Sequence, residues 1–209
     1  SLRSETSLQA DAGAEVNTEH LSLSATGFVN GIDHFIFYRK LSTINGSDSL
    51  VNVDGEDITA FTFSQAKALL YGAELYLDIH PHPLDWLHFE NTFSYVRGAF
   101  NQPIEGVKHI PFIPAARLIT QLKAEFLKKG KRISNLSISA ELDNTFRQNK
   151  AFTAYSTETP TMGYSLLNAF IGADIVHQKK ALFSVYISGA NLANTAYQSH
   201  LSRLKYTAV

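Results

Sequence analysis

The feature that most constrains this chain is a repeated alternation of polar and apolar residues. In the segment 117–126, one set of alternate positions includes Arg117, Gln121, Lys123 and Glu125. The intervening positions hold Leu118, Thr120, Leu122, Ala124 and Phe126. A two-residue period predicts a β-strand with one polar and one apolar face, and residues 132–147 repeat it. Alternating strands of about ten residues are the signature of a membrane-spanning β-barrel, whose apolar face points to lipid and whose polar face points to water.

Composition narrows the class of protein further. The chain has 209 residues, enough for one domain, and its formal net charge of −1 argues against a nucleic-acid partner. It has no cysteine, which excludes disulfides and thiolate metal sites. No run reaches the ~18 apolar residues of a membrane helix, and the first residues lack the basic and apolar regions of a signal peptide. We therefore expect a chain that either begins within a longer protein or forms a soluble domain.

The order of strands and connections is the next constraint. We expect eight strands, at residues 7–17, 20–31, 67–80, 86–100, 115–127, 132–147, 162–177 and 181–190. Short turns join alternate pairs at 18–19, 81–85, 128–131 and 178–180. The other connections are long and rich in Gly, Asn, Ser, Asp and Pro, at 32–66, 101–114 and 148–161. This rhythm predicts an all-β, antiparallel up-and-down transmembrane β-barrel with short periplasmic turns and long extracellular loops.

Two local alternatives and one global alternative remain open. Residues 63–77 also fit an amphipathic helix, and residues 33–38 fit either a strand end or one helical turn. Globally, a soluble β-sandwich or lectin-like ligand-binding module also has alternating strands, although soluble strands usually have about 3–10 residues. A sandwich would bury the apolar set that includes Leu75, Ile138 and Val185 against a second sheet. A barrel leaves this set exposed as one continuous band.

Short motifs are spread along almost the whole chain. Tyr71-Gly72-Ala73-Glu74 is similar to a Tyr/Lys-Gly-x-Glu strand, and residues 113–117 match Ile-Pro-x-x-Arg. Residues 2–15 look like Leu-x-x-Glu-x-Ser followed by Glu-x-Gly. Residues 82–87 with 93–95 look like Pro-x-x-Trp-Leu and its following strand, and residues 188–197 match x-Asn-Leu-Phe-Asn-x-x-Tyr. Taken in this order, the motifs resemble the C-terminal half of the barrel of TonB-dependent outer-membrane receptors.

The resemblance implies a ligand-gated importer in the outer membrane of a Gram-negative bacterium. The barrel of this family has about 22 strands and holds an N-terminal plug domain, and TonB with its partner complex supplies the energy. Ferric siderophores are the commonest cargo, while haem, cobalamin, copper complexes and glycans occur in sub-families. The resemblance therefore implies active uptake of a scarce nutrient, chiefly a ferric siderophore or another metal chelate, by a protein surrounded by outer-membrane lipid.

The chain also departs from the family pattern. Residues 1–209 correspond to about 8 strands of such a barrel. The plug domain, the TonB-contacting segment and the first half of the barrel do not appear in it. The final strand of the family is also missing, because the sequence stops at Tyr206-Thr207-Ala208-Val209. We therefore expect a part of a receptor that neither closes a barrel nor transports a ligand by itself.

Alternation places many carboxylates on the inward, polar face, namely Asp11, Glu15, Glu74, Asp78, Glu90, Glu125, Glu141, Asp143 and Asp174. Two explanations fit: a polar wall around a water-filled lumen, or docking of a basic plug surface through charge-assisted carboxylate–arginine pairs. In the resembling family, two barrel glutamates on neighbouring strands pair with plug arginines. The motif match carries that role to Glu74 and to Asp11, whose side chain is one methylene shorter than the glutamate of the family.

Three histidines lie close together in the sequence and suggest a metal site. His80 and His82 flank a proline in a short turn, and His88 follows in the next strand. No nearby Cys or His completes a four-ligand set of recognisable spacing. We therefore expect neither a metal site nor a cofactor.

Other polar residues fall in or near the long loops, where binding residues are often found. The candidates for ligand contact are His34, Tyr38 and His109. The sequence has no Gly-rich phosphate loop after a strand, no Gly-x-Ser-x-Gly elbow and no His-Glu-x-x-His motif. We expect no enzymatic activity and assign no catalytic residue.

Overall fold

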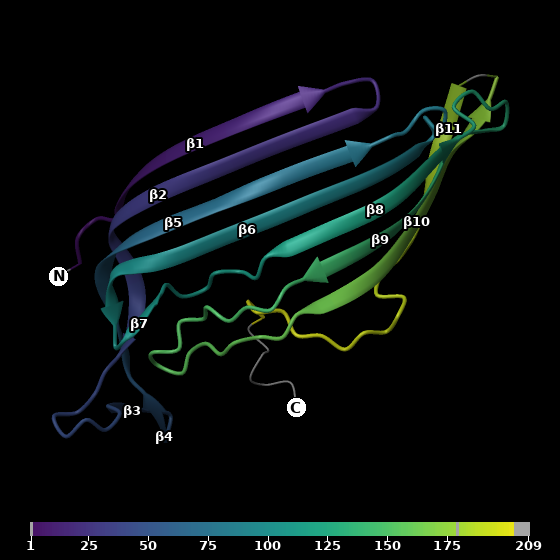
Figure 1. The fold of residues 1–209 in the computed structure, drawn as a ribbon. Coiled ribbons are helices and arrows are strands. Elements are labelled where there is room, and N and C mark those ends of the chain that lie inside the picture. The colour runs from purple at the N-terminus through teal and green to yellow at the C-terminus, as the bar shows by residue number, and fades with distance from the viewer. Residues whose placement is uncertain (1, 179, 203–209) are drawn as a thin grey trace.

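The computed structural model describes residues 2–178 and 180–202, and every regular element in them is a β-strand (Figure 1). The strands are β1 (Thr6–Asn17), β2 (Leu21–Lys40), β3 (Leu50–Val53), β4 (Glu56–Thr59), β5 (Phe61–Ile79), β6 (Leu87–Ile104), β7 (Val107–His109), β8 (Arg117–Phe126), β9 (Ile133–Thr145), β10 (Tyr164–His177) and β11 (Lys180–Gly189). These residues contain no helix of the length and apolarity needed to cross a membrane. The expected turn residue Lys179 and the chain end at 206–209 lie outside the described residues.

Nine strands form one curved sheet in which each main strand is antiparallel to its neighbours (Figure 1). The order is β1-β2-β5-β6-β8-β9-β10-β11, with β7 paired to β6. Within the described chain, β1 and β11 each pair with a single strand, so the sheet is an open segment of a barrel wall. The other sheet is only the β3–β4 hairpin, which projects from one end (Figure 1). The soluble β-sandwich or lectin-like alternative is therefore wrong.

The strand ends form two rims that differ in the length of their connections. At the turn rim, residues 18–20, 80–86 and 127–132 join β1 to β2, β5 to β6, and β8 to β9. At the loop rim, residues 41–60, 105–116 and 146–163 make the longer connections, which include β3, β4 and β7. The eight expected strands and the alternation of short and long connections are confirmed.

The expected loop 32–66 is wrong in detail, because β2 and β5 both extend into it. A bulge interrupts their pairing between Ile32 and Phe35, and His34 within it has a positive φ of 61°. A bulge inserts a residue on one strand and so shifts which residues share a face. The sequence period therefore breaks at this point although the backbone ladder continues. The helical alternatives are also wrong. Residues 33–38 and 63–77 belong to the paired strands β2 and β5.

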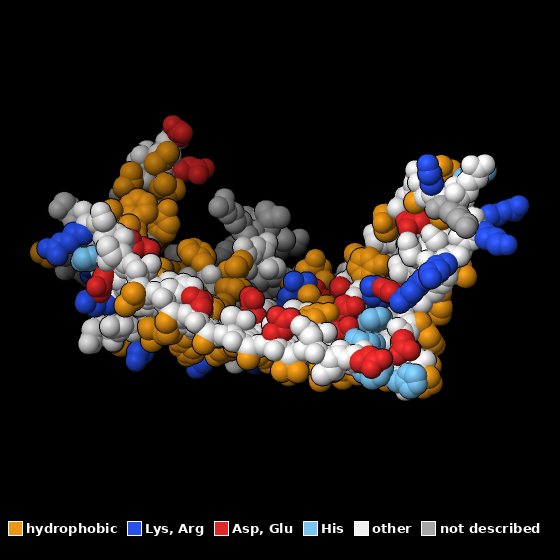
Figure 2. Space-filling view, turned by 90° about the horizontal axis from the view of Figure 1, so that it is seen from above, with side chains coloured by type: hydrophobic (Ala, Val, Ile, Leu, Met, Phe, Trp, Pro, Cys, Tyr) orange, Lys and Arg blue, Asp and Glu red, His pale blue; other side chains and the backbone are white. Residues whose placement is uncertain are grey.

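The two faces of the sheet differ as the alternation predicts. Large outward-facing side chains are exposed, among them Leu75, Phe89, Leu122, Leu142, Phe183 and Ile187. On β9, Ile138 is 45% exposed, whereas the adjacent Ser139 is 8% exposed. Figure 2 shows acidic side chains along the inner side of the curved molecule and hydrophobic side chains along its outer side. An apolar band of this extent requires an apolar surrounding, which a lipid bilayer supplies.

The densest packing lies at the loop rim rather than at the middle of the sheet. Phe100, Ile110 and Phe152 are 0–1% exposed and form one cluster with Phe37 and Tyr155. The ring centroids of Phe37 and Phe100 lie 4.9 Å apart, and those of Phe100 and Phe152 lie 5.7 Å apart. These residues come from β2, β6 and the connections 105–116 and 146–163. The loops therefore fold back onto the sheet and bury aromatic side chains there.

Candidate functional site

The inward face carries the carboxylates that alternation predicts, and most of them already bind neighbouring side chains. Arg117 and Asp143 form a bidentate pair, with Nε to Oδ1 at 2.7 Å and Nη2 to Oδ2 at 2.6 Å. Glu74 and Glu90, in contrast, make no hydrogen bond or ion pair with any residue that the structure describes. These two carboxylates are therefore available to a basic group that enters the concave side of the sheet.

Glu74 lies within β5, exposed on the inward face, and its neighbours in register are Thr26 of β2 and Ser94 of β6. Asp11 lies on β1, where its two carboxylate oxygens accept hydrogen bonds from Gln9 Nε2 at 2.9 and 3.1 Å. β2 lies between their strands, whereas the resemblance implied neighbouring strands. The structure therefore places both carboxylates on one face but leaves only Glu74 unpaired.

The glycine of the Gly-x-Glu motif has a packing reason. Gly72 lies beneath the ring of Phe28, its partner in register on β2. A methyl group added at Gly72 would collide with that ring and with the Tyr95 carbonyl oxygen. The glycine thus lets the Phe28 ring approach the wall closely, two residues from Glu74.

A cavity of about 360 Å³ with an aromatic lining lies at the loop rim. Its lining residues are Phe35, Ile36, Phe37, Tyr38, Phe61, Phe63, Pro111, Phe112, Phe152 and Thr157. The Tyr38 and Phe63 rings lie 4.9 Å apart on paired positions of β2 and β5. Cavities of this size with mostly apolar walls suit small organic molecules or the apolar part of a larger ligand.

Of the three loop residues expected to contact a ligand, only Tyr38 lines this cavity. His34 sits in the β2 bulge, where its carbonyl oxygen accepts a hydrogen bond from Gln65 Nε2 at 3.0 Å. His109 lies in β7 and pairs with Ala99. The structure does not bring the three together, and sequence reasoning missed the phenylalanines around Tyr38. The available signal was the density of aromatic residues at 35–38 and 61–63.

His109 has a distinct electrostatic environment at the loop rim. Partial burial lowers the pKa of its imidazole, and the positive charges of Lys150 and Arg97 lower it further. Both effects disfavour the protonated ring. His109 therefore stays neutral over a wider pH range than an exposed histidine.

Two buried polar side chains hold the loops in place. The Glu158 carboxylate accepts hydrogen bonds from the backbone N–H groups of Phe112, at 2.6 Å, and Phe152, at 2.8 Å. The Gln148 side chain donates to the carbonyls of Ile113 and Pro114, at 2.9 and 2.8 Å. Each therefore ties the connection 146–163 to the connection 105–116, which keeps the cavity walls in register.

The turn rim brings together residues that sequence spacing left apart. Asp78 of β5 lies beside His80 and His88, and one potential ligand atom from each lies within 4.8 Å of the others. The sequence placed Asp78 on the inward face and singled out the two histidines, but it did not bring the three together, because the grouping depends on the β5–β6 register. His82, the third histidine considered, is exposed and lies outside this group.

Comparisons with known proteins agree with this architecture. The family model "TonB dependent receptor-like, beta-barrel" matches residues 1–192. Among solved structures, the copper transporter OprC is similar, with a TM-score of 0.72 over 94% of this chain and 16% sequence identity. The chain spans 26% of the length of that structure, and at this identity the likeness establishes the fold. No curated protein matches the chain.

Proposed function

The chain belongs to the TonB-dependent receptor-like β-barrel family, and from that premise we propose that it is part of the wall of an outer-membrane importer. Proteins of this family lie in the outer membrane of Gram-negative bacteria, and this chain therefore lies there too. The importer takes up a scarce nutrient by active transport. The family consists of receptors and transporters rather than enzymes.

The observation that carries this proposal is the opposite character of the two faces of one open sheet. The outward face presents exposed Leu75, Phe89 and Ile138, as a lipid-facing wall requires. The inward face presents carboxylates, including the unpaired Glu74. A wall of this kind surrounds a polar lumen, and a polar lumen gives a hydrophilic nutrient a path through the membrane.

The partners follow from the same premise. The plug domain of the full-length receptor fills the lumen, and TonB with its inner-membrane complex supplies energy through that plug. Glu74 contacts a basic plug residue, because its carboxylate is exposed on the inward face and unpaired within the described chain. Asp11 plays a smaller part in the same docking, since Gln9 already occupies both of its oxygens.

The proposed cargo is a metal chelate, and a ferric siderophore is the first choice. The cavity of about 360 Å³ at the loop rim supports this choice, because its aromatic lining can cover the apolar or aromatic part of a chelating molecule. Tyr38 adds a hydroxyl group to the otherwise apolar wall. OprC is a copper transporter by name. A copper complex is therefore the alternative cargo that the experiment compares with a ferric siderophore.

Uptake by living cells tests the proposal. A deletion strain and a strain complemented with the full-length receptor are compared for accumulation of radiolabelled iron, supplied as a ferric siderophore, and of radiolabelled copper. The proposal predicts iron accumulation that requires both the receptor and the proton-motive force. If the receptor increases the accumulation of copper but not of iron, the cargo is a copper complex instead. Equal accumulation of each metal in the two strains would refute the importer function.

The docking role of Glu74 has a separate test. Glu74→Ala in the full-length receptor should loosen the plug, so that uptake falls or passive entry of a large antibiotic rises. Glu90→Ala is the matched control, because Glu90 is equally unpaired on the inward face but lies outside the Gly-x-Glu motif. Wild-type uptake and permeability for Glu74→Ala would remove its assigned role.

A further inference from the structure

A group of histidine and acidic side chains gathers at one end of the sheet (Figure 2). The β5–β6 hairpin forms its centre at the turn rim. The register pairs Ile79 with Phe89 and Asp78 with Glu90, so His80 lies across from His88, and their ring centroids are 5.2 Å apart. Alternation puts Asp78, His80 and His88 on the inward face, opposite in direction to the exposed Ile79 and Phe89.

The distances within this group match a metal site. Asp78 Oδ2 lies 3.0 Å from His88 Nδ1 and 3.5 Å from His80 Nδ1. Ligand atoms in a tetrahedral site with metal–ligand bonds of about 2.0–2.1 Å lie about 3.3 Å from one another. These two separations bracket that value, and the three ligand atoms all lie within 4.8 Å of one another, so adjustment of the side chains would bring them to the distances that a small cation needs.

The hydrogen bonds of His80 fix which of its ring nitrogens is free. Its Nε2 lies 2.5 Å from the carbonyl oxygen of Glu19, and because a carbonyl oxygen only accepts, Nε2 is the N–H donor. In the neutral ring, Nδ1 then carries the lone pair; it lies 3.5 Å from Asp78 Oδ2 and makes no hydrogen bond within the described chain. A histidine that binds a metal usually donates its other ring N–H to a backbone carbonyl or carboxylate in this way.

Asp78 is itself under-satisfied. The residue is 8% exposed, and its Oδ1 makes no hydrogen bond with any described residue. A buried carboxylate is costly unless hydrogen bonds or a cation compensate it. His88 Nδ1 donates the one hydrogen bond that Oδ2 accepts, and a cation would replace this proton.

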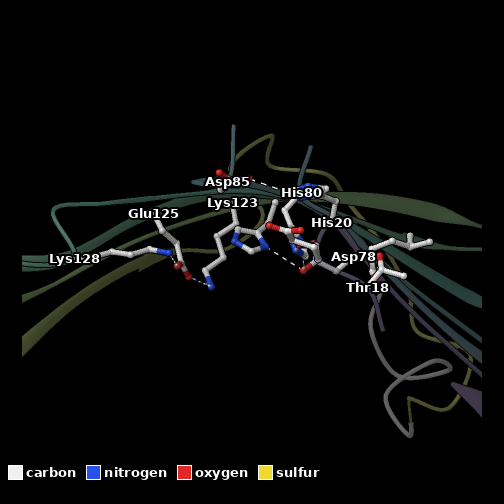
Figure 3. Close-up of polar contacts among 11 residues, drawn as sticks. Thr18, His20, Asp78, His80, Asp85, Lys123, Glu125 and Lys128 are labelled. Carbon is white, nitrogen blue, oxygen red and sulfur yellow. Dashed lines mark hydrogen bonds and ion pairs between the residues drawn. The ribbon is translucent and has the colours of Figure 1, made fainter. Parts of the chain in front are cut away.

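The surrounding charges leave an excess of negative charge on the group. Glu90 lies directly opposite Asp78 on the adjacent strand, and like charges in that position repel. Lys123 lies opposite His88, but its ammonium group pairs with Glu125 at 2.6 Å. Figure 3 shows this lysine with Glu125 and Lys128 on one side of Asp78 and His80. Among the described residues, no lysine or arginine pairs with Asp78 or Glu90, so a divalent cation would balance their negative charge.

We propose that Asp78, His80 and His88 form a binding site for a divalent transition-metal cation of the Zn²⁺ type on the lumen side of the turn rim. Two imidazoles and one carboxylate favour such a cation over Mg²⁺ or Ca²⁺, which prefer all-oxygen ligands. The site takes the bare cation and is independent of the cargo that the receptor carries.

His20 is one candidate for a fourth ligand. It precedes β2, its ring centroid lies 6.1 Å from that of His80, and its Nδ1 is buried without a hydrogen bond in the described chain. Water takes the fourth position if His20 does not move toward it. Binding would join the two strands of the β5–β6 hairpin at their ends and fix the rim that surrounds the periplasmic mouth of the lumen.

Zinc binding to the purified full-length receptor tests the site. Titration calorimetry of chelator-treated protein should show one Zn²⁺ bound at this site in wild type. His88→Gln and Asp78→Asn should each weaken that binding by more than about 100-fold, because each removes a direct ligand, and even loss of an outer-shell partner costs about 10- to 100-fold. His82→Gln is the matched control, because His82 lies in the same turn with its side chain exposed. Equal binding by His88→Gln and His82→Gln would overturn the proposal.

A second measurement does not depend on how the variants fold. X-ray absorption at the zinc edge of wild-type receptor, loaded with one equivalent, should show only nitrogen and oxygen ligands with the outer-shell scattering of two or three imidazoles. A spectrum without imidazole scattering would also overturn the proposal. So would zinc binding that rises with added zinc and does not saturate at one equivalent.

Discussion

The two rims of the sheet are stabilised by different interactions. At the loop rim, Phe100, Ile110 and Phe152 are almost fully buried, and the buried carboxylate of Glu158 binds two backbone N–H groups. At the turn rim, Asp78 is buried, and its neighbours are histidines. One end of the wall therefore packs as the interior of a soluble domain does, whereas the other is polar.

This difference follows from what each rim has to organise. Long connections can be ordered only if they bury enough apolar surface to offset the backbone entropy lost, which is about 1–2 kcal/mol per residue. The aromatic cluster at the loop rim supplies that surface. Ordering a short turn costs little backbone entropy, so the turn rim needs less buried apolar surface. It can therefore carry polar side chains that bind a cation.

The largest expected effect is at the loop rim. Phe152→Ala should lower the local stability of the connections 105–116 and 146–163 by about 3–5 kcal/mol, because it removes a fully buried aromatic side chain. Amide hydrogen exchange in the full-length receptor measures this opening directly. Phe112→Ala is the control, since Phe112 is 60% exposed and should change exchange little. Similar exchange in the two variants would show that the cluster does not order the loops.

Between the rims, the effect of a lysine substitution on barrel stability should depend on which face of the sheet carries it. Ile138→Lys should destabilise the barrel by about 2–4 kcal/mol if that position faces the middle of the bilayer. Ser137→Lys, on the inward face of the same strand, should be tolerated, because Ser137 borders an open polar hollow with Glu125 and Asp174. Urea unfolding of the receptor in lipid vesicles measures both, and equal losses would contradict the assignment of faces.

The two hydrogen bonds that Glu158 accepts at the loop rim should contribute less to the stability of the loops than the aromatic cluster does. Glu158→Gln replaces one of the two acceptor oxygens by a donor, so one of the two bound N–H groups loses its partner. The expected cost is about 1–3 kcal/mol in the opening of the connection 146–163. Limited proteolysis within that connection should speed up accordingly. An unchanged cleavage rate would mean that packing alone holds the two loops together.

The smallest effect concerns pH at the loop rim. The pKa of His109 in the folded protein is lowered from the ordinary value of 6.5, so the unfolded or opened form binds the proton more tightly. The stability of this rim is therefore fully present above about pH 6.5 and decreases as pH falls through the folded pKa. Hydrogen exchange of β7 should accelerate on acidification in wild type but not in His109→Gln. The same acceleration in both would assign it to another group.

The parts of the fold that alternation governs could be predicted from the sequence. The faces of Ile138 and Ser139, and the main strands, depend on local period and turn residues, which the sequence carries directly. The extension of β2 could not be predicted, because the bulge at His34 shifts the period while backbone pairing continues.

The sites depend on contacts between strands, which a single sequence does not encode locally. Glu74 could be selected from its motif, but its lack of a partner depends on every neighbour across the sheet. The grouping of Asp78 with His88 depends on the register of one hairpin. The cavity around Tyr38 likewise requires residues from β2, β5 and two loops.

The central claim is that this sheet is a membrane wall with lipid on one side and an aqueous lumen on the other. Cysteine substitution along β9, one position at a time from 136 to 142, tests it most directly in a cysteine-free full-length receptor in outer membranes. A water-soluble maleimide should label positions 137 and 141 and leave 136, 138, 140 and 142 unlabelled, while Gln121 covers Ser139 and slows its reaction. Labelling without a two-residue period, or labelling of the even positions, would contradict the account.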